Sequence, residues 1–186
     1  MFLKKSREYI GKFLLQSEAK KNSRNRRAFN LEDAKTIGIL FDSSNKEDFD
    51  LLKKYITYLK EMKKKVKAIG YYSSGFVPQF TYSKLEYDFF TPKELNLYCK
   101  PTEAFVKNFI EEEYDILIDL NMRAELPLQF IGAASKAQFK VGIHNDFNEK
   151  NYDFLIKVDT DKSVKFFLRQ IDTYLFMINN RTNQPL

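Results

Sequence analysis

The sequence is poor in the residues that build redox and metal sites. In 186 residues it has one cysteine, Cys99, one histidine, His144, and no tryptophan. A single thiol excludes an internal disulfide and a multi-cysteine metal cluster, and a single imidazole excludes a site that needs two. We therefore expect no metal site.

Long apolar runs are missing as well. No run approaches the roughly 18–20 residues that span a bilayer. Near the N-terminus, Lys4, Lys5 and Arg7 interrupt the apolar residues before the core of a signal peptide can form. The sequence therefore predicts a cytoplasmic protein.

The residues that are present suffice for a folded core. Hydrophobic residues make up 44% of the chain and aromatic residues 16%, which excludes a wholly disordered protein. The length falls within the range of about 100–200 residues that is typical of one domain. We expect a charged N-terminal arm over 1–29, one domain over 30–180 and a short tail over 181–186.

Positive charge is concentrated in this arm. Residues 1–29 contain nine lysines and arginines against two glutamates, whereas the rest of the chain contains 22 basic and 23 acidic residues. Clustered cations bind phosphates and release counterions from a polyanion. The arm therefore predicts binding to RNA or to a ribonucleoprotein such as the ribosome. Five of its cations are the candidate binding residues: Lys20, Lys21, Arg24, Arg26 and Arg27.

The first part of the arm has an amphipathic pattern. Apolar residues at helical spacing predict a helix over 2–17. Four of them, Phe2, Ile10, Phe13 and Leu14, could instead dock the protein on an anionic membrane surface or on a partner protein. A frayed, solvated leader is an equally open interpretation, and a mitochondrial transit peptide is a weaker one because the segment contains two glutamates.

The body of the chain alternates buried strands with helices. The expected strands cover 36–41, 66–72, 85–90, 114–120, 139–143 and 153–158, with a long loop over 73–83. Helices are expected over 43–65, from 91, after Pro101, over 125–136 and over 162–179. The sequence predicts capping boxes from Ser44 to Glu47 and from Thr91 to Glu94.

This alternation is typical of an α/β fold with a mostly parallel sheet of about six strands covered on both faces. We expect a single Rossmann-like or flavodoxin-like three-layer sandwich, preceded by the basic helical arm. The expected strand order is near 3-2-1-4-5-6 or 2-1-3-4-5, with 37–41 and 116–120 at the centre.

Ligands of such sheets bind at the carboxyl ends of the strands. The polar residues expected in that crevice are Asp42, Ser43, Ser44, Ser73, Asn121, Arg123 and His144, followed by Asn145. The loop after the first strand has no glycine, and Glu47 and Asp48 would repel a phosphate from the helix start. Asp42 and Asp119 are better explained as loop caps than as a catalytic pair. We therefore expect no nucleotide cofactor and no catalytic role for these residues.

One segment resembles a known enzyme family. Residues 114–143, YDILIDLNMRAELPLQFIGAASKAQFKVGI, are similar to part of the N-terminal domain of heptosyltransferase-type glycosyltransferases of the GT-B class. The resemblance implies a strand, a helix and a second strand in a Rossmann-like half. That family has a Gly-Asp motif after its first strand, where this chain has DSSNKED. The whole chain also resembles an uncharacterised bacterial family of about this length, which implies no activity.

Together these observations predict a binding module without catalytic activity that docks to an anionic partner through its arm. The rival expectation is a small transferase or hydrolase that uses Asp42, Ser43, Asn121 and His144. The third is a peripheral membrane or protein-docking module.

Overall fold

The computed structural model describes residues 2–74, 87–158 and 161–178, with side chains from Arg7 onward. Its centre is one six-stranded sheet in which every neighbouring pair is parallel, in the order β3-β2-β1-β4-β5-β6. This confirms the α/β class and the first of the two expected strand orders. The strands are β1 (Thr36–Asp42), β2 (Lys65–Tyr71), β3 (Tyr87–Phe90), β4 (Ile116–Asp119), β5 (Phe139–Ile143) and β6 (Phe154–Ile156).

Strands β1 and β4 lie at the centre of the sheet, as predicted. Ile37 pairs with Ile116 and Ile39 with Ile118, and all four side chains are buried. Because these strands carry apolar residues on both faces, helices must cover both sides of the sheet to keep those residues from water. The expected long loop over 73–83 falls mostly outside the described residues.

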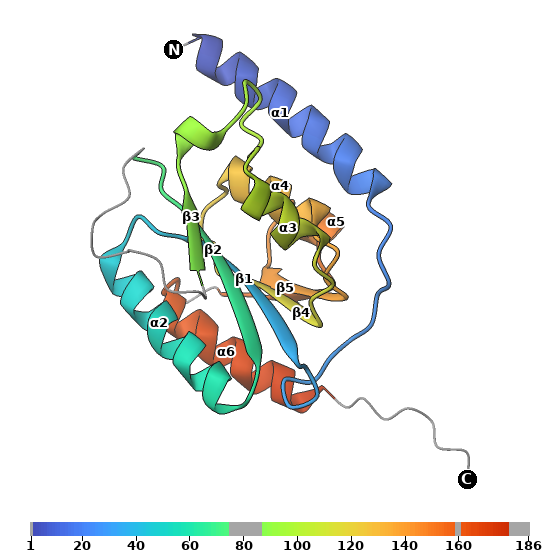
Figure 1. Ribbon diagram of the computed structural model, residues 1–186, viewed down its shortest axis with the longest axis vertical. Helices are drawn as coiled ribbons and strands as arrows, with labels where there is room; N and C mark the ends of the chain where they lie inside the picture. The colour runs from blue at the N-terminus through green and yellow to red at the C-terminus, as the bar shows by residue number, and fades with distance from the viewer. Residues whose placement is uncertain (1, 75–86, 159–160, 179–186) are drawn as a thin grey trace.

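Two pairs of helices cover the sheet (Figure 1). Helices α2 (Lys46–Glu61) and α6 (Val164–Met177) pack on one face through residues such as Phe49, Leu52 and Phe167. Helices α3 (Ala104–Glu111) and α4 (Leu126–Ala134) pack on the other. The short helix α5 (Asn148–Asn151), which the sequence analysis does not predict, precedes β6.

The two expected capping boxes have different outcomes. The box from Thr91 to Glu94 is confirmed and opens the 3-10 helix η2 (Pro92–Glu94). The box from Ser44 is wrong, because Asn45 is the N-cap of α2 and accepts from the amide of Glu47 at 2.8 Å. Ser44 instead donates its amide and hydroxyl to Asp42, which closes the turn after β1.

The N-terminal arm begins with helix α1 (Phe2–Lys21), which is four residues longer than predicted and lies outside α4 (Figure 1). Leu15 is buried against Leu126 and Phe130 of α4. Gly11 allows α1 to lie close to the backbone at Tyr98, because a Cβ at this position would lie 2.5 Å from the carbonyl oxygen of Tyr98. The solvated-leader interpretation is therefore wrong for α1.

Two polar contacts hold α1 against the body, one at Arg7 and one near its C-terminal end. Arg7 donates from Nε to the carbonyl of Leu97 at 2.7 Å, and Lys100 pairs with Glu18 at 2.6 Å. None of the described helices is both long and apolar enough to cross a membrane.

The buried position of Ile118 gives a direct test of the sheet order. We expect Ile118→Asp to unfold the protein, because an unpaired carboxylate between two helical layers costs several kcal/mol. Ile118→Val is the control and should cost only about 1 kcal/mol. Circular dichroism melts measure both variants, and a wild-type melt of the Asp variant would contradict the assignment of β4 to the centre.

Candidate functional site

The arm continues from α1 as an extended segment, 22–29, that is held along the body. Asn22 donates from Nδ2 to the carbonyls of Ala133 at 2.7 Å and Ser135 at 2.9 Å, where α4 ends. The amide of Arg27 donates to the carbonyl of Gln138 at 3.2 Å. Both ends of this short segment are therefore fixed by the backbone of the body.

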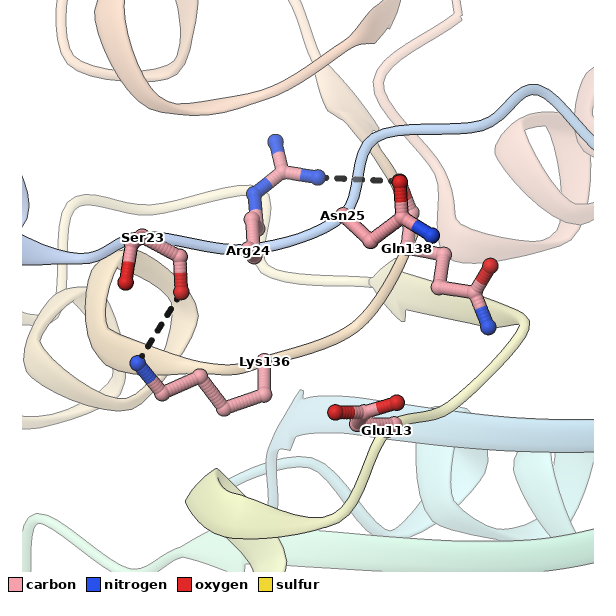
Figure 2. A pocket seen from close by; sticks show the side chains of 6 residues that line it. All are labelled: Ser23, Arg24, Asn25, Glu113, Lys136 and Gln138. Atoms are coloured by element: carbon pink, nitrogen blue, oxygen red, sulfur yellow. Dashed lines mark hydrogen bonds between the residues drawn. The ribbon is translucent and has the colours of Figure 1, made fainter.

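Arg24 is the buried anchor of the segment. Its side chain is only 3% exposed and pairs with Asp153 at 2.7 Å. It also donates to the carbonyls of Ala137 at 3.1 Å and Gln138 at 2.9 Å, and Figure 2 shows the second contact. Because this guanidinium is buried and three of its five N–H groups already have acceptors, it is not available to a phosphate. Arg24 therefore does not belong with the candidate binding residues.

The other four candidate cations, Lys20, Lys21, Arg26 and Arg27, are exposed. The Arg26 side chain is 68% exposed and lies at the outer limit of an ion pair, 3.9 Å from Asp153. Arg27 lies over the ring of Phe29, with 5.0 Å from Cζ to the ring centroid. We call these four residues the basic strip.

Lysines of the body adjoin the basic strip. Lys107 and Lys136 line a hollow of about 320 Å³ together with Lys21. A second hollow of about 300 Å³ shares Lys136 and is bordered by residues 23–25 and Glu113 (Figure 2). Lys136 donates to the carbonyl of Ser23 at 3.2 Å, so its charge sits directly beside the arm. The sequence does not reveal that these lysines lie beside the arm, because at least 78 positions separate them from it.

Lys140 lies buried beneath the anchor. Its Nζ donates to the carbonyls of Gly132 at 2.7 Å and Ala133 at 3.1 Å in the last turn of α4. Burial lowers the pKa of Lys140 to about 7; the charge of Arg24 acts in the same direction, and Asp153 partly opposes it. A neutral amine still has two N–H groups, which match the two carbonyl acceptors.

The expected crevice residues after β1 do not form a reactive group. Asp42 accepts from the amide of Ser44 at 2.9 Å and from its hydroxyl. Ser43 is 3% exposed and packs onto Gly70, where a Cβ would lie 2.2 Å from its Oγ. A buried serine in this position cannot reach a ligand in the crevice.

The residues after β4 form a buried network. Asp119 accepts from the hydroxyl of Tyr152 and from both the amide and the side chain of Asn121. Burial raises the pKa of Asp119 to about 6, and these hydrogen bonds partly oppose the shift. Asn121 and Arg123 line a recess of about 10 Å³, which is the size of one water molecule. This network caps the end of β4.

His144, after β5, is apart from that recess. Its Nε2 lies 2.8 Å from Glu149 on α5, and both side chains are largely exposed. The structure therefore brings Asn121, Arg123 and Asn145 together around the recess. Asp42 and His144 contact other residues, and Ser43 is buried. Among the described residues, no three His, Cys, Asp or Glu side chains are grouped so that they could hold a metal ion.

A larger groove of about 780 Å³ separates α1 from the carboxyl edge of the sheet. Ser73 is the one expected crevice residue that lines it. Its charged lining residues balance, with Arg7, Lys12 and Lys150 against Glu8, Glu125 and Asp146. This groove therefore carries no net charge that would select an anion or a cation.

The chain belongs to the DUF6913 family, a family of unknown function, which matches residues 7–178. The match includes most of α1 as well as the α/β body, and it supports the expectation of an uncharacterised family. No curated protein matches the chain. The glycosyltransferase resemblance of residues 114–143 and the bacterial origin stay predictions.

The anchoring role of Arg24 can be tested by its removal. We expect Arg24→Met to lower the free energy of unfolding by about 2–3 kcal/mol, because Asp153 and two carbonyls lose a buried donor. The matched control, Arg26→Met, removes an exposed arginine two residues away and should cost less than about 0.5 kcal/mol. Urea denaturation measures both, and equal losses would contradict the anchor.

The buried Lys140 makes stability depend on pH. The folded protein loses this proton near pH 7 and the unfolded chain near 10.5, so the unfolded chain binds more protons between these values. The free energy of unfolding should therefore rise with pH, by up to about 3 kcal/mol from pH 7 to 9.5. In Lys140→Met this rise should be absent when urea denaturation is compared at the two pH values. Parallel profiles would show that Lys140 keeps an ordinary pKa.

Proposed function

We propose that the protein is a non-catalytic cytoplasmic module that docks to RNA, or to a ribonucleoprotein such as the ribosome, through the basic strip. The observation that carries this proposal is that four exposed cations stand at the end of α1 and on the segment after it, which buried contacts hold in place. Arg24 and Asn22 fix the segment, while Lys20, Lys21, Arg26 and Arg27 remain exposed.

Fixing the segment in advance favours binding. A free arm would lose conformational entropy when it met its partner, and that loss would weaken the complex. The strip instead presents its charges at a set spacing, and Lys107 and Lys136 of the body extend the positive surface. The contact of Arg27 with the ring of Phe29 also limits the rotamers of the Arg27 side chain.

The charge distribution points to a polyanion as the partner. The chain outside 1–29 is close to neutral, so long-range attraction comes from the arm. Guanidinium and ammonium groups on an exposed strip release counterions from phosphates, which gives affinity without sequence readout. The separate contacts of Asp42 and His144 and the burial of Ser43 favour this proposal over an enzyme in the crevice.

The salt dependence of RNA binding tests the proposal. If each of the four strip cations neutralises one phosphate, log affinity should fall with log salt at a slope of about −2.8 to −3.6. The variant with Lys20, Lys21, Arg26 and Arg27 changed to Gln should lose most of this slope and most of the affinity. Fluorescence anisotropy with labelled RNA measures the slope.

A second variant controls for net charge alone. Four exposed lysines on α2, β2 and α6, away from the arm, are changed to Gln: Lys54, Lys60, Lys65 and Lys165. This variant should keep the wild-type slope to within about one charge. If the two variants lose affinity equally, or if the wild-type chain binds no RNA, the proposed function is wrong.

A further inference from the structure

The solvent face of α1 combines exposed aromatic rings with cations. Tyr9 is 77% exposed and Phe13 is 70% exposed, although most of the large apolar side chains that the structure describes are buried. The two rings are four residues apart, so they lie on one side of the helix, about 6 Å apart along its axis. Phe2, which the sequence placed on the same apolar side, lies outside the residues whose side chains are described.

From Arg7 onward, no exposed residue of α1 is acidic. The exposed residues of α1 from Arg7 onward are Arg7, Tyr9, Ile10, Lys12, Phe13, Gln16, Lys20 and Lys21. Glu8 lines the groove on the carboxyl side of the sheet, and Glu18 is paired with Lys100. The exposed residues beside the two rings are therefore cationic or uncharged: Lys12, which also borders the groove, Gln16 and Lys20. At Lys20 and Lys21 this face runs into the basic strip.

We propose that this face binds single-stranded RNA, with unpaired bases stacked on Tyr9 and Phe13 and the phosphates beside Lys12 and Lys20. The proposal rests on the proposed function and specifies which form of RNA the arm binds. Aromatic rings stack on any base, and cations track the backbone, which is how proteins bind single strands without reading sequence. A duplex keeps its bases stacked inside, so it would contact the cations but leave the rings unused.

A membrane surface fits this face less well. Interfacial helices bury a broad apolar side in the lipid. In α1 that side is already occupied, because Leu15 is buried against α4 and Leu14 packs beside it. From Arg7 onward, where the side chains of α1 are described, Tyr9, Ile10 and Phe13 are its exposed apolar residues, and they form a narrow surface. The ring spacing and the adjoining strip of cations therefore favour a nucleic-acid strand.

The test compares single-stranded and duplex RNA. The probe is a fluorescein-labelled RNA of about 15 nucleotides without self-complementarity, used alone and annealed to its complement. The full-length protein should bind the single strand at least about tenfold more tightly than the duplex at equal salt. Tyr9→Ala with Phe13→Ala should remove this preference, lowering single-strand affinity about tenfold or more and leaving duplex affinity and the salt slope unchanged.

Two further variants make the result specific. Tyr9→Phe with Phe13→Tyr keeps both rings and should retain the preference. Tyr174→Ala with Met177→Ala removes exposed apolar residues from α6, on the other face of the sheet, and should change nothing. Because all four positions are exposed, we expect these variants to fold.

The outcomes separate this inference from the proposed function. If the wild-type chain binds both RNAs equally and the alanine variant behaves like it, stacking is wrong while docking to RNA stands. If the wild-type chain binds neither RNA, both are wrong. If vesicles rich in phosphatidylserine retain the protein, and the alanine change abolishes that retention but not RNA binding, the face is a membrane anchor and the inference is overturned.

Discussion

The C-terminal end of α4 determines where the N-terminal arm lies. A helix ends with carbonyl groups that have no partner within the helix, and inside a protein they need donors from elsewhere. Asn22 and Lys140 donate to the carbonyls of the last turn of α4 and the residue that follows it, and Arg24 donates to the carbonyls just before β5. Two of these three donors belong to the arm. The packing of the body is therefore completed only when the arm is in place.

The charges around this junction are arranged so that little buried charge is left unpaired. The positive charge of Arg24 is matched by Asp153, whose other oxygen accepts from the amide of Lys140. Lys140 would add a second cation in the same interior, and its pKa of about 7 lets it shed that charge while keeping both hydrogen bonds. If the arm moved away, the carboxylate of Asp153 would lose Arg24, and leaving this partly buried charge unpaired would cost free energy. The free-energy cost of breaking the pair of Arg24 and Asp153 therefore holds the exposed cations of the arm in fixed positions on the body.

The strands were predictable because each is a short apolar run between polar turns, and β5 was predicted to the residue. Helix ends were less predictable, since a cap depends on which of several neighbouring polar side chains faces the helix. At α2, Asn45 is the N-cap and Ser44 donates to Asp42 instead.

The sequence predicted an amphipathic helix for α1 but not which of its sides is buried. The helix packs through Gly11 and Leu15 and leaves Tyr9 and Phe13 exposed. Its apolar residues surround too much of the helix for periodicity alone to identify the buried side.

The arginine cluster shows why a charge pattern is an incomplete guide to a binding site. In sequence, Arg24, Arg26 and Arg27 are equivalent members of one basic run. In the fold, an arginine can serve acceptors inside the protein as well as outside it, because its planar fork reaches a carboxylate and carbonyls at once. Arg24 meets Asp153 and two carbonyls in this way, whereas Arg26 and Arg27 face solvent. The acceptors that use Arg24 come from residues more than 110 positions away, so only the folded chain separates the anchor from the cations that remain for a partner.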